Sequence, residues 1–343
     1  MHVLVVDDSA VVRQTMSALL AAEPDITVSV AADPIIAMQK MSVQRPDVIL
    51  LDLQMPRMNG LTFLDKIMAE DPIPVVICSA VTEPQSGPAF QALARGAVDV
   101  VAKPKVGIRD FLQESRVVVI DALRAAAQAR LPRRRSAPAA RLQPTDPAAH
   151  AAVGAIAVGA STGGTEALRT IMAQLPASTP GVLIVQHMPE VFTAHFAHHL
   201  DQQSAMDVAE AREGDRLEPG RAFVAPGNRH MMLRRDGRGY YVGLSEGPLV
   251  SRHRPSVDVL FRSVAEVAGA RAVGVLLTGM GADGADGLLE MKRRGAATIA
   301  QDESSCIVFG MPREAILRGG VDEVLPLALI GAAIVERTSR GGN

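Results

Sequence analysis

Short apolar runs alternate with amphipathic helical patterns along the first 128 residues. Strands that are apolar on both faces and joined by helices are typical of a parallel sheet covered on both sides. This part of the chain is therefore predicted to be a doubly wound α/β domain. The apolar runs are 3–6, 26–30, 48–51, 75–77 and 98–102, and the helical patterns are 11–22, 34–41, 60–68, 88–95 and 108–127.

The same alternation resumes after residue 151. Apolar runs at 153–158, 182–186 and 272–278 predict buried strands, and a helical pattern over 165–175 follows the first of them. Runs 230–235 and 240–244 flank the turn-forming segment Asp236-Gly237-Arg238-Gly239, which indicates a β-hairpin. The second half is thus expected to be another parallel-sheet α/β domain, Rossmann-like, with a hairpin added.

The segment between these halves has a composition of its own. Of the 20 residues from Arg130 to Ala149, 14 are Ala, Pro or Arg. Such a segment has little to bury and cannot offset the entropy of ordering. We predict a domain over 1–128, a flexible linker over 129–150 that spans roughly 25 Å, and a domain over 151–343.

Composition narrows the class of protein. The chain is 48% hydrophobic and 21% charged, as in a globular protein, and its net charge of −2 argues against nucleic acid as a partner. No apolar run reaches the ~18 residues of a membrane span, and the N-terminus turns acidic at Asp7, unlike a signal peptide. Cys78 and Cys306 lack metal-ligand spacing. We expect a cytoplasmic protein.

Polar residues follow the apolar runs of the first domain. Asp7 and Asp8 come after the first run, Asp52 after the third, Ser79 after the fourth and Lys103 after the fifth. Ligands of such sheets bind at the carboxyl ends of the strands. Three carboxylates gathered there repel one another unless a cation lies among them, and Mg²⁺ prefers oxygen ligands. A hydroxyl and a lysine beside them would hold a phosphoryl group.

Candidate catalytic residues follow three runs of the second domain. Ser161 lies in a Gly-x-Ser-x-Gly sequence between a predicted strand and a helix, a turn that exposes a serine hydroxyl close to helix N–H groups. His187 and Asp283 also come just past strand ends. In one parallel sheet, these three side chains would meet at one edge and perform nucleophilic catalysis. Their order along the chain, Ser, His, Asp, differs from that of the α/β-hydrolases.

Two alternatives stay open at this point. The turn around Ser161 could instead bind a phosphate, and Gly279-x-Gly281-x-x-Gly284 resembles a dinucleotide fingerprint of an NAD-dependent enzyme. If the segment bound a dinucleotide, the Asp283 carboxylate would lie against the negatively charged pyrophosphate. This repulsion disfavours the NAD interpretation. Among the other histidines, His253 is the rival base, as a loop residue before a helix.

The first domain resembles the receiver domain of two-component response regulators, which has a flavodoxin-like fold. The segment Leu51-Asp52-Leu53-Gln54-Met55-Pro56-Arg57-Met58-Asn59-Gly60 is similar to that family's phosphorylation loop. The resemblance implies Asp52 as phosphoacceptor, with Mg²⁺ held by Asp7, Asp8, Asp52 and the carbonyl of Gln54. Ser79 matches the hydroxyl switch position and Lys103 the invariant cation. Receivers often carry an aromatic residue three positions before that lysine, where this sequence has Val100.

The second domain resembles the catalytic domain of chemotaxis protein-glutamate methylesterases. The resemblance implies Ser161 as nucleophile, His187 as general base and Asp283 as the acid that orients it, with backbone N–H groups of Thr162 and Met280 forming the oxyanion hole. No cofactor is expected for the esterase reaction. The segments that carry the likeness are 159–164, 186–189, 225–227, 253–258, 277–284 and 309–315.

Together these resemblances imply a phosphorylation-activated serine esterase of bacterial chemotaxis. It would demethylate glutamate γ-methyl esters on chemoreceptors, releasing methanol, and deamidate specific glutamines there. A histidine kinase would supply the phosphoryl group, and we expect a monomer with no membrane insertion. A DNA-binding response regulator would need a basic recognition helix, for which the slightly acidic second domain offers little. A scaffolding protein with an inactive site is the other alternative.

Overall fold

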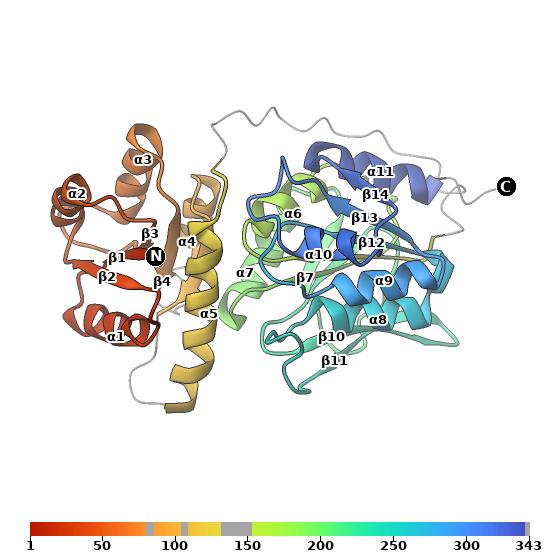
Figure 1. Ribbon diagram of the computed structural model, residues 1–343. Helices are drawn as coiled ribbons and strands as arrows, with labels where there is room; N and C mark the ends of the chain where they lie inside the picture. The colour runs from red at the N-terminus through yellow and green to blue at the C-terminus, as the bar shows by residue number, and fades with distance from the viewer. Residues whose placement is uncertain (80–85, 104–108, 132–152, 340–343) are drawn as a thin grey trace. The chain divides into compact units, whose positions relative to one another are not determined.

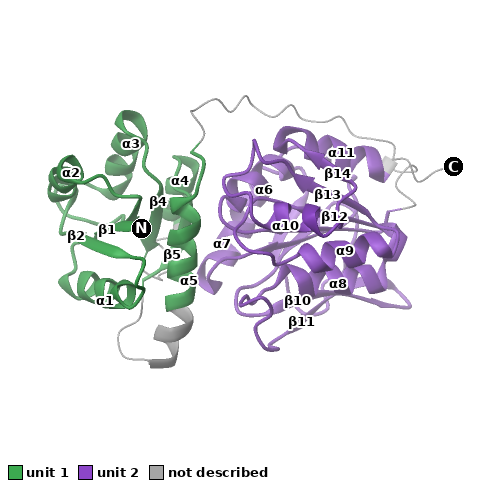
Figure 2. Ribbon diagram, in the orientation of Figure 1, with its two compact units in different colours: residues 1–133 green, residues 134–343 purple. Residues whose placement is uncertain are grey.

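The computed structural model describes residues 1–79, 86–103, 109–131 and 153–339 (Figure 1). The chain divides into two compact units, Met1–Arg133 and Arg134–Asn343 (Figure 2). Residues 132–150, most of the predicted linker, lie outside the described residues.

The first unit contains a parallel five-stranded sheet in the order β2-β1-β3-β4-β5. Every residue of β3 and β4 is buried, so helices cover both faces of the sheet, as predicted. The strands are β1 (His2–Val6), β2 (Thr27–Ala31), β3 (Val48–Leu51), β4 (Val75–Ser79) and β5 (Asp99–Ala102). The helices are α1 (Ala10–Ala21), α2 (Pro34–Val43), α3 (Gly60–Glu70), α4 (Ser86–Ala94) and α5 (Arg109–Ala127).

Polar caps explain where the helices of this unit begin. The side chain of Ser9 accepts a hydrogen bond from Val12 N, that of Asp33 from Ile35 N and Ile36 N, and that of Asn59 from Leu61 N. Each cap satisfies an N–H group that has no partner inside its helix. The first turns of α1, α2 and α3 are thereby fixed at Ala10, Pro34 and Gly60.

The second unit contains a seven-stranded parallel sheet in the order β14-β13-β12-β6-β7-β9-β8, and a separate antiparallel pair, β10-β11. The strands are β6 (Ala155–Ala160), β7 (Val182–Gln186), β8 (Asp207–Glu210), β9 (Arg221–Val224), β10 (His230–Asp236), β11 (Gly239–Ser245), β12 (Ala272–Leu276), β13 (Ala297–Gln301) and β14 (Glu323–Leu325). The helices are α6 (Gly164–Met172), α7 (Glu190–Asp201), α8 (Val257–Val267), α9 (Ala285–Arg293), α10 (Met311–Leu317) and α11 (Leu327–Ser339), with a 3₁₀ turn at Gly269–Arg271.

The parallel sheets and the hairpin confirm the predicted fold class. Three predicted carboxyl ends of strands were wrong by two residues. The strand expected to end at 77 continues to Ser79. The strand expected to end at 158 continues to Ala160, because Gly159 and Ala160 pair with Val185 and Gln186. The strand expected to reach 278 ends at Leu276.

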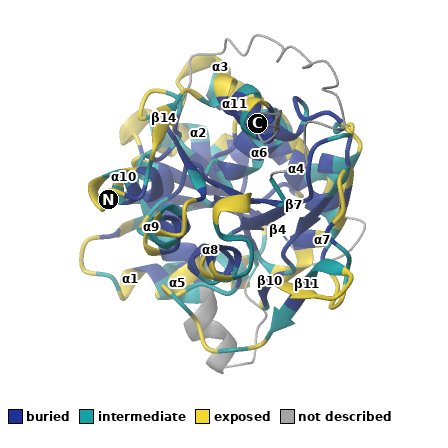
Figure 3. Cartoon of the chain, turned by 90° about the vertical axis from the view of Figure 1, so that its right-hand side faces the viewer, coloured by how far each residue is buried: buried dark blue, intermediate teal, exposed yellow. Residues whose placement is uncertain are grey.

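Burial follows the sheets. All residues of β6, β7 and β12, the middle strands of the second sheet, are buried, and exposed residues lie on outer helix faces and loops (Figure 3). α8 packs against α9 and against β10 of the hairpin. None of the helices in the described ranges combines the length and apolar character of a membrane-spanning helix.

Candidate functional site

The register of three neighbouring strands, β12, β6 and β7, brings Ser161 and His187 together at the carboxyl end of the second sheet. Ala160 pairs with Gln186, so Ser161 and His187 are the next residues after paired positions on β6 and β7. On the other side, Ser161 N donates to the carbonyl of Thr278, just past the end of β12, at 3.0 Å. Ser161 is partly exposed and Thr162 is buried.

Asp283 reaches the same end of the sheet from the turn after β12. Its Oδ2 lies 2.8 Å from Nε2 of His187, whose side chain is only 7% exposed. Because a carboxylate only accepts, Nε2 of His187 carries the proton of this hydrogen bond. Nδ1 is buried and has no hydrogen-bond partner among the described residues. Nδ1 is therefore the ring nitrogen left to act on a hydroxyl.

The Asp283 carboxylate is held by the start of α8. Oδ1 accepts from the Ser256 hydroxyl at 2.7 Å and from Asp258 N at 3.1 Å, and Oδ2 accepts from Val257 N at 2.8 Å. Burial opposes ionisation, but the hydrogen bonds from His187, Ser256 and Val257 hold the pKa of the Asp283 carboxyl below its ordinary value. The group that faces His187 is thus an ionised carboxylate with fixed geometry.

A buried amide joins the Ser161 and His187 segments. Nε2 of Gln186 donates to the main-chain carbonyls of Ser161 at 2.9 Å and of His187 at 3.0 Å. Gly163 then adopts a left-handed φ of 77° and precedes α6. The N-terminus of that helix lies directly behind Ser161, as predicted from the sequence.

The turn that carries Met280 is supported from the loop before α10. Gly310 N and Met311 N both donate to the carbonyl of Gly279, at 3.1 and 2.8 Å. A Cβ added to Gly310 would lie 2.6 Å from that carbonyl oxygen, so only glycine fits there. Met280 itself is partly exposed.

One valine side chain fills the space between the Ser161 and Asp283 segments. A Cβ added to Gly159 would lie 2.2 Å from Cγ1 of Val257, and one added to Gly284 would lie 2.5 Å from the same atom. Two glycines therefore let the start of α8 approach both β6 and the Asp283 turn. This close approach is what lets Val257 N reach the carboxylate.

No hydrogen bond joins the Ser161 hydroxyl to His187 among the described residues. The structure does bring the two residues to adjacent strand ends, and Asp283 binds the Nε2 side of the imidazole. Hydrogen bonds of catalytic groups often form or shorten only when substrate binds. The rival histidine, His253, stacks on His187 with ring centroids 3.7 Å apart and an angle of 10° between the planes.

The second predicted site lies at the carboxyl ends of the strands of the first sheet. Asp7, Asp8 and Asp52 each offer a carboxylate oxygen, and these oxygens lie within 4.8 Å of one another. Nζ of Lys103 lies 2.8 Å from Oδ2 of Asp7 and 2.8 Å from Oδ2 of Asp52. Ser79 is buried, and its carbonyl accepts from Lys103 N at 2.8 Å. All five predicted residues thus meet.

Charge and burial compete at this second site. Burial raises the pKa of the Asp52 carboxyl above its ordinary value, with Lys103 acting in the opposite direction. For Lys103, burial acts first to lower the pKa, but hydrogen bonds to Asp52 and Asp7 raise it overall. Clustered carboxylate oxygens, two of them buried, are the donor set that a hard divalent cation such as Mg²⁺ prefers.

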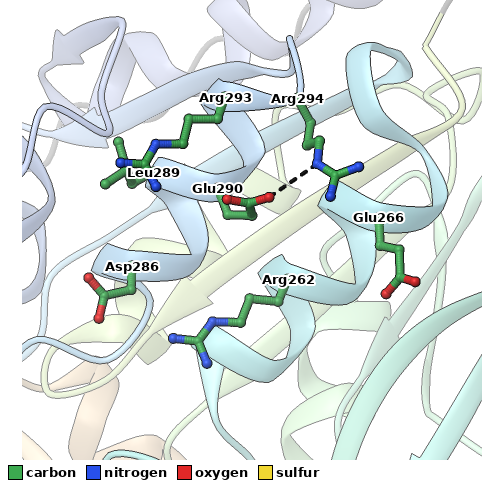
Figure 4. A pocket seen from close by; sticks show the side chains of 7 residues that line it. All are labelled: Arg262, Glu266, Asp286, Leu289, Glu290, Arg293 and Arg294. Carbon is green, nitrogen blue, oxygen red and sulfur yellow. Dashed lines mark hydrogen bonds and ion pairs between the residues drawn. The ribbon is translucent and has the colours of Figure 1, made fainter.

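A charged pocket between α8 and α9 contains none of the predicted site residues (Figure 4). Within it, Arg294 pairs with Glu290 at 3.1 Å, and Asp286 pairs with Arg318 outside it. The pocket mixes equal numbers of acidic and basic side chains and holds no group placed to react. Its lining residues are Arg262, Glu266, Asp286, Leu289, Glu290, Arg293 and Arg294.

The sequence prediction assigned no role to Ser256, Gln186 or His230. Ser256 is the residue before α8, where a serine is a common helix cap, and this position was its only sequence signal. In the structure the hydroxyl of Ser256 donates a hydrogen bond to Asp283, and its N–H donates to Nδ1 of His230 at 3.2 Å.

The structure also bears on the dinucleotide alternative. In the Gly279-x-Gly281-x-x-Gly284 turn, Asp283 is buried and bonded to His187, which argues against a pyrophosphate bound in that turn.

Comparison with known proteins identifies both halves of the chain. A family model described as CheB methylesterase matches residues 156–334, and one described as response regulator receiver domain matches residues 3–115. The crystal structure of the Thermotoga maritima CheB methylesterase catalytic domain is 36% identical, covers 54% of this chain and 98% of its own, and superposes with a TM-score of 0.53.

Relatives align with nearly the whole of this chain. Protein-glutamate methylesterase/protein-glutamine glutaminase 5 of Anaeromyxobacter dehalogenans is 57% identical, covering 96% of this chain and 94% of the relative. Protein-glutamate methylesterase/protein-glutamine glutaminase 3 of Geobacter metallireducens is 55% identical, covering 97% of this chain and 98% of the relative. The chain therefore belongs to the family of protein-glutamate methylesterases/protein-glutamine glutaminases that combine a response regulator receiver domain with a CheB methylesterase domain.

Proposed function

We propose that this protein hydrolyses γ-methyl esters of glutamate on methyl-accepting chemoreceptors and deamidates specific receptor glutamines. The observation that carries the proposal is the buried pair of His187 and Asp283 next to Ser161 at the carboxyl end of one sheet. The family membership supports the substrate class. We also propose that it acts as a monomer in the cytoplasm.

In the proposed reaction, Ser161 Oγ attacks the γ-carbonyl carbon of the glutamyl ester. Nδ1 of His187 takes the hydroxyl proton, while Nε2–H continues to donate to Asp283. Backbone N–H groups of Thr162 and Met280 would stabilise the oxyanion of the tetrahedral intermediate. Unlike the serine-protease arrangement, in which Nδ1 faces the acid, the ring here would work through Nδ1.

The second half of the reaction reverses these roles. The proton on Nδ1 of His187 passes to the methoxy oxygen, the C–O bond breaks, and methanol leaves a γ-glutamyl ester on Ser161. Water then loses a proton to Nδ1 and attacks the same carbonyl carbon. As the C–Oγ bond breaks, Nδ1 returns that proton to Ser161 Oγ, and the glutamic acid product loses its own proton to solvent to leave as the carboxylate. With a glutamine substrate, the leaving group is ammonia.

The receiver domain is proposed to regulate this esterase by phosphorylation of Asp52 from a chemotaxis histidine kinase. Asp7, Asp8 and Asp52 would hold Mg²⁺, which shields the negative charge that gathers when a phosphoryl donor approaches. Lys103 lies where it can bind an acyl-phosphate oxygen, and Ser79 lies beside it at the end of the neighbouring strand.

The variant Ser161→Ala tests the catalytic assignment. Methanol release from methylated receptor membranes should fall by about 10⁶-fold, the cost of removing the nucleophile of a serine-protease triad. The exposed Ser304, next to a surface turn, provides the matched control Ser304→Ala, which should keep normal activity. Activity of Ser161→Ala within tenfold of the unmodified enzyme would refute the proposal.

A further inference from the structure

His253 covers one face of the imidazole that is proposed to move protons. The two rings are 3.7 Å apart between centroids and nearly parallel, at 10°. His187 has one polar anchor, the hydrogen bond from Nε2 to Asp283, and its Nδ1 has no partner among the described residues. A single hydrogen bond fixes the position of one ring atom but leaves the ring plane free to tilt about it. The stacked ring supplies the missing restraint.

The segment that carries His253 is itself firmly held. His253 N donates to the carbonyl of Val250 at 2.9 Å, and Val250 N donates back to the His253 carbonyl at 3.1 Å. Two residues beyond Pro255, the N-terminus of α8 begins with the N–H groups that bind Asp283. The same short segment therefore orients the acid with its backbone and contacts the base with a side chain.

A buried histidine fixes the far side of this segment. Nδ1 of His230 accepts from Ser256 N at 3.2 Å, and Nε2 of His230 lies 2.9 Å from the carbonyl of Pro248. His230 thus bridges residues on both sides of His253. The His253 ring is presented by a closed loop rather than by a free chain.

The ionisation of His253 depends on its burial and on its neighbours His187, Asp283 and Arg252. Burial first, and His187 second, lower the pKa of the His253 imidazole well below its ordinary value, Arg252 acts in the same direction, and Asp283 acts against them. His253 is consequently uncharged at neutral pH. An uncharged ring can remain stacked when His187 gains a proton, whereas a charged one would repel it.

We propose that His253 is a positioning residue whose ring holds the plane of His187 so that Nδ1 stays aimed at Ser161 throughout the proton transfers. This inference rests on the proposed function, because it assigns His253 a part in the same reaction. The stacked face of the ring acts, and its nitrogens transfer no proton.

The test compares three variants of the full-length enzyme on methylated receptor membranes. His253→Ala should lower kcat by about tenfold or more, since small misplacements of a reacting group are costly, with KM changed less than about threefold. His253→Phe keeps an aromatic face without ionisable nitrogen and should retain kcat within about threefold. The exposed His198 of α7 provides the control His198→Ala, which should behave as the unmodified enzyme.

Two readouts separate positioning from a structural effect. NMR spectra of enzyme with ¹⁵N-labelled histidine should show His187 protonated at Nε2 in the unmodified enzyme and in His253→Phe. In His253→Ala, the His187 signals should move toward the average of the two tautomers. The acid limb of the kcat/KM profile should show the same single ionisation in the unmodified enzyme and in His253→Phe.

Several results would overturn the inference. It fails if His253→Ala retains full kcat, if Ala and Phe are equally damaging, or if His253→Phe removes an ionisation from the pH profile. Should His253→Ala not fold, the activity and NMR spectrum of His253→Phe decide alone. An active Ser161→Ala would refute the proposed function itself, whereas an inactive Ser161→Ala with an unimpaired His253→Ala would refute only the positioning role.

Discussion

The hydroxyl of Ser256 donates to Oδ1 of Asp283 across 2.7 Å in the buried part of the site. Together with His187 Nε2, Val257 N and Asp258 N, it makes four donors around one carboxylate. All four partners donate, so both oxygens of the residue at position 283 must accept hydrogen bonds. A substitution that replaces either oxygen by a donor group should therefore disturb the site.

Asp283→Asn should impair both the reaction and the fold. An amide has one accepting oxygen, so its NH₂ group must face either His187 N–H or the donors from Ser256 and Asp258. Facing His187 it favours the wrong tautomer, and the analogous change in a serine protease lowers kcat about 10⁴-fold. Facing the helix start it leaves donors unsatisfied, at about 1–3 kcal/mol of unfolding free energy.

Methanol release and urea unfolding of the isolated variant measure these two effects. Asp286→Asn is the matched control, because Asp286 lies one turn further along, on the surface, and pairs with Arg318. The control should change neither quantity appreciably. A fully active Asp283→Asn would rule out Asp283 as the orienting acid.

Acid should destabilise the methylesterase domain through the same carboxylate. The pKa of Asp283 is lower in the folded protein than in the unfolded chain, so its ionisation stabilises the fold at neutral pH. That contribution is complete above the unfolded value near 4 and is lost as the pH falls through the folded value. Calorimetry below about pH 4 should show a falling Tm, and Asp283→Asn should show a smaller fall. An identical pH dependence in both proteins would contradict this account.

Gln186→Met should uncouple the nucleophile from the base. The substitution keeps the length of the side chain but removes both hydrogen bonds to the carbonyls of Ser161 and His187. A shift of about 1 Å between reacting groups can lower kcat about 10²-fold. Gln174→Met, at another buried glutamine of this domain, should reduce stability without a comparable loss of kcat. Equal kcat values in the two variants would show that the Gln186 amide has no part in catalysis.

Asp52→Asn should remove activation by a phosphodonor and spare the basal rate. Asp52 belongs to the first unit, whereas the Ser161 site is built entirely from the second. Methanol release is compared with and without acetyl phosphate, and Asp65→Asn on the exposed side of α3 serves as the control. Stimulation that persists in Asp52→Asn would exclude Asp52 as the acceptor.

The central strands of both sheets could be predicted because they are buried on both faces and read as continuous apolar runs. The strands β8, β9, β13 and β14 were not predicted. β8 and β14 are the outermost strands of the second sheet, and few of their residues are buried. β9 and β13 are mostly buried, but their sequences, RAFV and ATIAQ, mix apolar with polar residues and do not stand out as continuous apolar runs. That Ser161, His187 and Asp283 lie at the same end of one sheet could be predicted because parallel strands place their carboxyl ends together. The stacking of His253 and the choice of Nε2 for Asp283 depend on loop contacts that no periodicity in the sequence records.

The crowding around Val257 limits how this enzyme can be stabilised. Replacing glycine by alanine often stabilises a protein by restricting the unfolded chain, by about 0.4–1 kcal/mol. At Gly159 and Gly284 that route is closed, because the added methyl group would push α8 away and carry the donors of Asp283 with it. At Gly237, in the hairpin turn, no atom lies within 4 Å of an added Cβ, so a substitution of this glycine by alanine meets no steric obstacle.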